Sequence, residues 1–300
     1  MVGAAESLGE EPLMTRVLLT GAGGQLGTDI VLAAPEHSGI ELHGLDRSGL
    51  DITDHVATSA TIAQIEPDVI IHAAAYTAVD DCESNSQLAH AVNAEGTASI
   101  TNAARAIGAR VIYVSTDYVF DGTKAEPYVE TDTPNPTSVY GTSKLEGEHA
   151  VADLGDDGLI VRTSWVCGPH GANMVKTILR AAVNHPTLTF VDDQIGKPTL
   201  SGDLARTLLT LANRNDSGIL HVTNEGIVSW YEFCREVLIA AGEDPARVQP
   251  CSTIELQPPR PAPRPANSVL ANTRFDDLGL PLLRDFREPL MEVINSLQAG

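Results

Sequence analysis

Short apolar runs alternate with segments of helical length through the first half of this chain, and no other feature limits the fold as strongly. Strands are expected over residues 16–20, 40–45, 68–73, 110–115 and 159–162. Helices are expected to begin near Gly24, Asp54, Ser86 and Ser138. Strands that alternate with helices form a parallel sheet with helices on both faces. The sequence therefore predicts a doubly wound α/β fold.

Glycines recur at every third position directly after the first of these strands, at Gly21, Gly24 and Gly27. Glycine allows a tight turn, lets the backbone approach a pyrophosphate, and lets the next helix pack closely on the sheet. An ordinary glycine-rich turn is the alternative. The position between a strand and a helix favours a dinucleotide site of the Rossmann type.

Two charged neighbours end the second predicted strand and leave the choice of cofactor open. Asp46 lies where a carboxylate hydrogen-bonds the adenosine ribose of NADH. Arg47 follows it and would instead contact the ribose phosphate of NADPH. A solvated ion pair at a strand end is the third interpretation. NADPH and NADH both remain candidates.

Tyr140 and Lys144 are four residues apart on a predicted helix, so their side chains lie on one face. A phenol has a pKa of about 10, and a nearby ammonium and nicotinamide ring would lower it toward neutrality. The pair indicates hydride transfer, although its spacing also occurs by chance on exposed helices. Ser115, Thr116 and Asp117 follow the fourth strand, at the sheet edge where ligands bind. A turn or helix cap would use the same residues.

The pattern changes after Trp165, where Gly and Pro interrupt the chain. Trp165 itself either covers a bound ligand or belongs to the core. Further helices are expected over residues 201–213, 230–241 and 285–297, with a strand at 218–223 that returns to the sheet. Five prolines within residues 258–265 predict an extended surface loop, because proline fits neither a helix interior nor a central strand.

The domain organisation follows from this change of pattern. A chain of 300 residues accommodates either one large α/β unit or a nucleotide-binding domain with a smaller lobe. We favour the second arrangement. It consists of a disordered extension at residues 1–13, an NAD(P)-binding Rossmann domain at 14–164 with the later strand, and a C-terminal α/β substrate-binding lobe at 165–300.

Composition excludes several classes of partner. Nineteen basic against forty acidic residues give a net charge of -21, which would repel nucleic acid and anionic membranes. An anionic substrate therefore needs a local basic patch. Four scattered cysteines and the absence of a long apolar run predict a cytoplasmic protein with reduced thiols. The nine histidines form no metal-binding array, so no metal centre is expected.

Several motifs resemble those of the extended short-chain dehydrogenase/reductases. They are TGAGGQLG at residues 20–27, STDYVF at 115–120 and YGTSK at 140–144. Within that superfamily the chain resembles the family that reduces dTDP-4-dehydrorhamnose. Further matching segments are residues 73–80, 93–97, 162–166, 193–199 and 264–268. The combination is far more specific than any single motif.

The resemblance implies hydride transfer from NADPH or NADH to the C4 ketone of dTDP-4-dehydro-L-rhamnose, giving dTDP-L-rhamnose. Tyr140 would then donate the proton, Lys144 would tune its pKa, and Thr116 would hold the sugar oxygen. Residues implied to bind the cofactor are Gly21, Gly24, Gln25, Leu26, Gly27, Asp46, Arg47, Asp51, Ile52, Ala75, Tyr76, Thr77, Tyr140 and Lys144. Residues implied to bind the substrate are Thr116, Asp117, Trp165, Arg264 and Asn267.

The resemblance also defines the alternatives. Related dehydratases carry a glutamate after the aspartate, where this chain has Tyr118, so dehydration is disfavoured. One close relative of the fold is a non-catalytic regulatory subunit of methionine adenosyltransferase, and a reductase or epimerase of another nucleotide sugar is a further alternative. Some family members bind magnesium between subunits through clustered glutamates. Glu288 and Glu292 alone do not support such a site here, and a monomer or a homodimer is expected.

Overall fold

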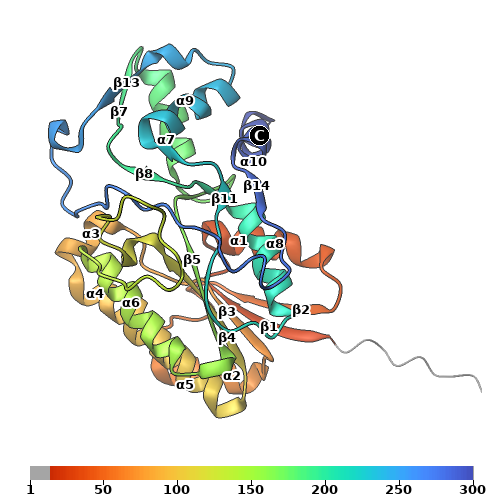
Figure 1. The fold of residues 1–300 in the computed structure, drawn as a ribbon. Coiled ribbons are helices and arrows are strands. Elements are labelled where there is room, and N and C mark those ends of the chain that lie inside the picture. The colour runs from red at the N-terminus through yellow and green to blue at the C-terminus, as the bar shows by residue number, and fades with distance from the viewer. Residues whose placement is uncertain (1–13, 300) are drawn as a thin grey trace, which may run out of the picture.

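The structure, a computed structural model, describes residues 14–299. The predicted disordered extension at residues 1–13 lies outside the described residues. Six parallel strands form the central sheet in the order β10-β5-β4-β3-β1-β2 (Figure 1). They are β1 (Thr15–Thr20), β2 (Ile40–Leu45), β3 (Val69–His72), β4 (Arg110–Thr116), β5 (Gly158–Thr163) and β10 (Gly218–His221). The predicted doubly wound α/β fold is confirmed.

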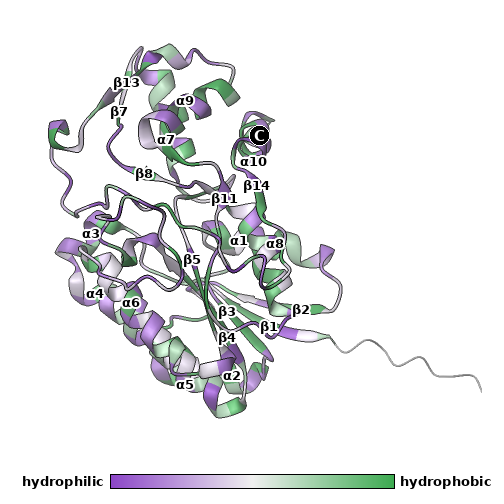
Figure 2. Ribbon diagram, in the orientation of Figure 1, coloured by the Kyte–Doolittle hydropathy of each residue, from purple (hydrophilic) through white to green (hydrophobic). Residues whose placement is uncertain are grey.

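Helices cover both faces of this sheet (Figure 1). α1 (Gln25–Ala33) and α8 (Ser201–Ala212) pack together on one face. The other face carries α2 (His55–Ile65), α5 (Thr97–Ile107) and α6 (Val139–Ala152). Side chains of a strand alternate between the two faces, and in β1 Val17 and Leu19 join the α1/α8 core while Leu18 joins the other. Both cores are apolar because both faces are buried, and Figure 2 shows green, hydrophobic strands at the centre.

The remaining elements form a smaller lobe above the sheet (Figure 1). Its helices are α7 (Met174–Asn184), α9 (Trp230–Ala240) and α10 (Arg287–Ala299), which enclose a separate core around Phe233 and Phe286. Four two-stranded pairs complete it or join it to the sheet: β6 (Val166–Cys167) with β9 (Thr199–Leu200), β7 (Leu188–Val191) with β13 (Val248–Cys251), β8 (Ile195–Gly196) with β12 (Val228–Ser229), and β11 (Asn224–Glu225) with β14 (Leu283–Asp285).

The chain after residue 165 contributes to both cores. α8 packs on α1, β10 extends the sheet beside β5, and Phe275 and Leu280 join the sheet core. The chain after residue 165 therefore passes between the two cores several times. Residues 258–265 contain neither helix nor strand, as the prolines predict. All four cysteines lie in the described part of the chain and carry free thiols.

Local sequence explains where the helices begin. Asp54 caps α2 by accepting hydrogen bonds from the backbone N–H groups of Val56 and Ala57, and Ser138 caps α6 in the same way. The helix expected from Ser86 is interrupted, because α4 (Ser86–His90) passes through a π-helical turn at Ala91–Gly96 before α5. Such turns occur mostly at functional sites. A short helix, α3 (Val79–Ser84), precedes α4.

Candidate active site

The glycine loop joins β1 to α1 at the point where the strand order reverses. β1 lies between β2 and β3, so the loops after β1 and β3 leave the sheet edge in opposite directions, which opens a crevice between them. Gly21 has a φ of +76°, and a Cβ there would lie 2.7 Å from the Ala74 nitrogen. A Cβ on Gly27 would lie 2.1 Å from the Gly21 carbonyl oxygen. Only glycine fits these positions.

No side chain caps the N-terminus of α1, so the backbone N–H groups of its first turn remain available to a ligand in the crevice. Gly24 is the N-cap residue and makes no side-chain cap hydrogen bond. A helix N-terminus carries a partial positive charge and unpaired donors, which suit a phosphate. The loop therefore has the shape and the polarity of a pyrophosphate cradle.

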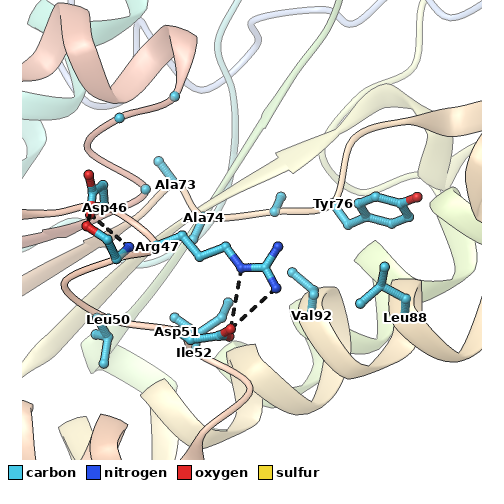
Figure 3. Close-up of a pocket in the computed structure, with 15 residues that line it drawn as sticks. Asp46, Arg47, Leu50, Asp51, Ile52, Ala73, Ala74, Tyr76, Leu88 and Val92 are labelled. Carbon is cyan, nitrogen blue, oxygen red and sulfur yellow. Dashed lines mark hydrogen bonds and ion pairs between the residues drawn. The ribbon is translucent and has the colours of Figure 1, made fainter.

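Two hollows meet at this loop, and both are lined by Gly21, Gly24 and Ala75. The outer hollow, of about 420 Å³, is drawn in Figure 3. It is lined by the predicted cofactor residues Asp46, Arg47, Asp51, Ile52 and Tyr76, with Leu88 and Val92 on the opposite wall. The inner hollow, of about 600 Å³, contains Gln25, Leu26, Gly27, Thr77, Thr116, Asp117, Tyr140, Lys144 and Trp165. All predicted site residues except Arg264 and Asn267 line one or both.

Charged groups in the outer hollow are exposed. The Asp46 carboxylate accepts hydrogen bonds from the backbone N–H groups of Ser48 and Gly49 and from the Ser48 hydroxyl, which hold its pKa below the usual range. Arg47 is 81% exposed and donates to Asp51 at 3.4 Å, as the dashed lines of Figure 3 mark. Asp46 is thus held in a turn by three hydrogen bonds, whereas the Arg47 guanidinium is exposed and makes only long contacts with Asp51.

The inner hollow brings the predicted catalytic residues together from two elements. Thr116 ends β4, while Tyr140 and Lys144 lie one turn apart on α6. The Thr116 hydroxyl donates to an Asp117 carboxylate oxygen at 3.0 Å. The Lys144 ammonium donates to the Val114 carbonyl at 2.8 Å. All these side chains are buried, Tyr140 to 8% exposure and Lys144 to 2%.

Burial moves the pKa of Tyr140 away from neutrality and the pKa of Lys144 toward it. Burial raises the pKa of Tyr140, the Asp117 charge raises it further, and an interaction with Thr116 opposes both. Burial lowers the pKa of Lys144 to about 7, against the attraction of Glu148. In the chain alone the pKa of Tyr140 is therefore raised and not lowered, because desolvation of the phenolate is the largest influence on it.

Asp117 is a second unusual group at the sheet edge. Burial raises its pKa to about 6, while hydrogen bonds from Ser268 and Thr116 oppose the shift. One of its carboxylate oxygens has no hydrogen-bond partner within the described residues. Tyr118, which follows it, packs its ring edge-on against Tyr140 with centroids 5.6 Å apart. A phenol thus stands where dehydratases would need a carboxylate.

Trp165 is part of an aromatic pair that sequence reasoning missed. Its ring stacks on Trp230 at 3.7 Å and 9°, and both rings line the inner hollow. Trp165 has a φ of +48°, a strained value for a bulky residue. Gly196 leaves no room on the other side, because a Cβ there would lie 2.6 Å from the ring. Trp230 is the first residue of α9 and lies 65 residues after Trp165, so no local sequence pattern could predict their contact.

Two further groups support the inner hollow from behind. The Asn93 side chain, on the π-helical turn, accepts from the Tyr76 N–H at 2.8 Å and donates to the Ser143 hydroxyl at 3.0 Å. It thereby ties the loop after β3 to α6. Glu148 and Arg162 form a buried bidentate ion pair at 2.6 and 2.9 Å. Residue 93 lies in a segment matched by the resemblance, but nothing in the sequence assigned a contact to it.

Arg264 and Asn267 lie outside both hollows and already have protein partners. Arg264 makes a bidentate ion pair with Asp80 at 2.6 and 2.8 Å. The Asn267 amide donates to the carbonyls of Lys124 and Glu126. Neither side chain is therefore free in this arrangement.

Glu292 likewise has a protein partner, since it accepts from Arg284 at 2.8 Å. Across residues 14–299, no three His, Cys, Asp or Glu side chains are grouped so that they could hold a metal ion. Among the described helices, none combines the length and the apolar character needed to cross a membrane.

Taken with the parallel sheet, the arrangement of Tyr140 and Lys144 beside a glycine loop defines an enzyme of the extended short-chain dehydrogenase/reductase class. A family model described as RmlD substrate binding domain matches residues 14–299. A dTDP-4-dehydrorhamnose reductase of Streptomyces griseus is 41% identical over 288 residues, which cover 94% of this chain and 94% of that protein. The chain belongs to the dTDP-4-dehydrorhamnose reductase family, whose members are oxidoreductases.

Solved structures agree with this assignment. The crystal structure of a dTDP-4-dehydrorhamnose reductase from Clostridium acetobutylicum ATCC 824 has a TM-score of 0.90 and 42% identity, covering 94% of this chain and 99% of that one. The enzyme of Bacillus anthracis str. Ames, solved in complex with NADP, has a TM-score of 0.89 and 36% identity, with coverages of 94% and 99%.

Proposed function

We propose that this chain reduces the C4 ketone of dTDP-4-dehydro-L-rhamnose to the hydroxyl of dTDP-L-rhamnose. The observation that carries the proposal is the convergence of Thr116, Tyr140 and Lys144 on one hollow that continues into the glycine loop. Membership of the family supports the substrate class. The phenol at Tyr118 supports reduction over dehydration, because no carboxylate follows Asp117.

Tyr140 is the proposed proton donor to the ketone oxygen. A donor must keep its proton until the substrate is in place, and the raised pKa of Tyr140 favours that at neutral pH. Thr116 lines the same hollow, and in this proposal its hydroxyl, which donates to Asp117 in the chain alone, turns to hydrogen-bond the same oxygen. Both residues therefore act on one atom of the substrate.

Lys144 has the proposed role of stabilising the phenolate that remains on Tyr140 after proton transfer. Its ammonium is held by the Val114 carbonyl and lies 4.0 Å from the centroid of the Tyr113 ring. Because its pKa is about 7 in the chain alone, the ammonium form is lost as the pH rises through that value. We expect reductase activity to fall on the alkaline side for this reason.

The cradle fits a dinucleotide, since glycine at positions 21 and 27, where a Cβ would meet the backbone at 2.7 and 2.1 Å, lets the loop turn tightly before the N-terminus of α1. Bound NADPH or NADH supplies the hydride. In this proposal Asp46, Arg47 and Asp51 hold the adenosine end, and Lys144 contacts the nicotinamide ribose. The sheet with α8 and β10 binds the cofactor, and the remainder of residues 165–300 binds the sugar nucleotide through Trp165 and the loop that holds Arg264 and Asn267. The four free thiols support a cytoplasmic location.

The test supplies purified protein with dTDP-glucose, the upstream dehydratase and epimerase, and either NADPH or NADH. Oxidation of the reduced cofactor is followed by absorbance, and the sugar nucleotide formed is identified by mass spectrometry and NMR. We expect dTDP-L-rhamnose. Cofactor binding without oxidation would instead indicate a regulatory subunit, and a different reduced sugar would indicate another substrate of the same class.

A further inference from the structure

The proline-rich segment 258–265 is fastened to α3 by a single carboxylate, that of Asp80. Both terminal nitrogens of Arg264 donate to it, at 2.6 and 2.8 Å. The Ala262 N–H donates to it at 3.1 Å, and Arg260 lies 3.5 Å away. Asp80 thus contacts three residues of the segment from one position, which we call the Asp80 clasp.

The segment 258–265 has few backbone N–H groups of its own and is held by contacts with other parts of the chain. Five of its eight residues are proline, so only Arg260, Ala262 and Arg264 carry backbone N–H groups. Ala262 is buried. Pro265 packs directly on Gly122, where a Cβ would lie 2.5 Å from the proline ring. The segment therefore lies against the loop that follows β4 and Asp117.

Contacts lead from the clasp to the proposed proton donor. The positive charge of Arg264 also acts on Tyr118, where it opposes the burial that raises the pKa of this phenol to about 12. The Tyr118 ring packs edge-on against Tyr140 at 5.6 Å, and both rings line the inner hollow. Asp80 thus pairs with Arg264, the charge of Arg264 acts on Tyr118, and Tyr118 packs against Tyr140. A change at Asp80 would reach the inner hollow through one arginine and one ring.

The clasp also sets the charge beside the site. Arg260 and Arg264 against Asp80 leave one net positive charge in a chain whose total is -21. Both terminal nitrogens of Arg264 donate to Asp80. The Arg260 side chain lies farther from Asp80 and is 52% exposed. A guanidinium whose fork is already occupied cannot make a second bidentate contact with a diphosphate.

We propose that Asp80 is a positioning residue for the sugar nucleotide. It holds the proline-rich segment, and through Arg264 the Tyr118 ring, in the arrangement that receives the substrate. This inference rests on the proposed function. Arg264 serves here as the link between Asp80 and Tyr118, and Arg260 is the guanidinium left to meet the diphosphate. Without the clasp the segment has to be ordered when the substrate binds, which weakens binding.

Three variants test the inference. Asp80→Ala removes the clasp, Asp80→Glu keeps the carboxylate, and Asp81→Ala is the matched control, because Asp81 is the next residue of α3 and is exposed. Both aspartates lie in the first turn of α3, so loss of either has a similar effect on the helix dipole. The readouts are amide hydrogen exchange at Ala262, the Kd for dTDP by calorimetry, and KM and kcat with the sugar nucleotide.

For Asp80→Ala we expect loss of exchange protection at Ala262, a rise of about tenfold in KM and in the Kd for dTDP, and a smaller fall in kcat, given the strength of bidentate charge-assisted contacts. Cofactor affinity and Tm should match those of Asp81→Ala. Asp80→Glu should recover most of the KM. Unchanged KM and Ala262 protection in Asp80→Ala would overturn the inference. So would parallel losses of Tm and cofactor affinity, which would indicate a merely structural contact.

These readouts separate the two proposals. If the unaltered protein does not turn over the sugar nucleotide, the proposed function fails. Hydrogen exchange at Ala262 and dTDP binding then still decide whether Asp80 positions a nucleotide-binding segment, because neither measurement requires reduction of a sugar.

Discussion

The outer and inner hollows lie on either side of one glycine loop but are built in opposite ways. In the outer hollow, backbone geometry defines the shape and the charged groups are exposed, as with Arg47 at 81% exposure. In the inner hollow, buried side chains define both the shape and the chemistry. Tyr140, Lys144 and Asp117 are each buried and have shifted pKa values.

The difference shows how one fold separates binding from chemistry. A cofactor can be held by peptide groups and a helix N-terminus, which need only glycine to come close. Proton transfer needs ionisable groups whose pKa values are set by burial and by neighbours. Replacing a side chain should therefore lower turnover most in the inner hollow. Adding a Cβ should weaken cofactor binding most at the glycines.

The largest effect is expected at the phenol of the inner hollow. Tyr140→Phe should lower kcat by on the order of a hundredfold or more, because it removes general acid catalysis. Cofactor affinity should stay nearly unchanged. Turnover is measured by cofactor oxidation, with Tyr231→Phe on α9 as a control that should retain full activity. Undiminished turnover in Tyr140→Phe would exclude this residue from the mechanism.

The next effect is expected at the glycine loop. Gly27→Ala should destabilise the protein by about 2 kcal/mol and weaken cofactor binding, since the new Cβ would meet the Gly21 carbonyl at 2.1 Å and overpack the turn. Denaturant unfolding and cofactor titration measure the two effects. Gly202→Ala on α8 is the matched control, because the nearest atom to its Cβ is 3.9 Å away. Equal unfolding free energies and cofactor affinities in the two variants would mean that the close approach of Gly27 to the Gly21 carbonyl is unimportant.

A smaller effect is expected from the pH dependence of stability. The pKa of Lys144 is about 7 in the folded protein, below its usual 10.5. Between pH 7 and 10.5 the unfolded chain holds a proton on Lys144 that the folded chain has lost. The contribution of Lys144 to the free energy of unfolding therefore rises with pH across this range and falls as the pH drops toward 7. The measured quantity is the free energy of unfolding of the unaltered protein minus that of Lys144→Met. This difference should increase by about 1 kcal/mol between roughly pH 7.5 and 8.5. A constant difference between the two proteins over that window would show that Lys144 titrates normally.

The smallest effect is expected from an exposed charge of the outer hollow. Arg47→Ala should change the ratio of NADPH to NADH affinity by no more than about tenfold, because an exposed guanidinium is strongly screened by water and salt. Titrations at low and high salt measure the ratio, and the effect should shrink as salt is added. A salt-independent loss of a hundredfold or more would mean that Arg47 becomes buried against the cofactor.

Most of the fold was predictable because its signals are local. The strands of the sheet and the caps Asp54 and Ser138 follow from apolar runs and capping side chains within a few residues of each other. The glycine positions could be predicted for the same reason. The interruption of the helix from Ser86 could not, because the π-helical turn is stabilised by Asn93 contacts with Tyr76 and Ser143, far along the chain.

The proposed catalytic residues were predicted from a spacing and a resemblance, but their environment was not. Tyr140 and Lys144 lie one turn apart on α6 as expected, while the Lys144 ammonium donates to the Val114 carbonyl and burial raises the Tyr140 pKa. The stack of Trp165 on Trp230 joins residues far apart in the sequence and has no local signature. Arg264 was expected to bind the substrate, and its pairing with Asp80, 184 residues away in sequence, could not be predicted.

By itself, the sequence determined the order of strands and helices, the glycine turn and the pairing of a phenol with an amine four residues on, because periodicity and spacing act within one element. The tertiary structure decided which groups are buried together, and so the pKa values of Tyr140, Lys144 and Asp117, the stacking of Trp165 and the clasp at Asp80. Desolvation and charge pairing depend on neighbours from distant parts of the chain, and only the folded arrangement brings those neighbours into contact.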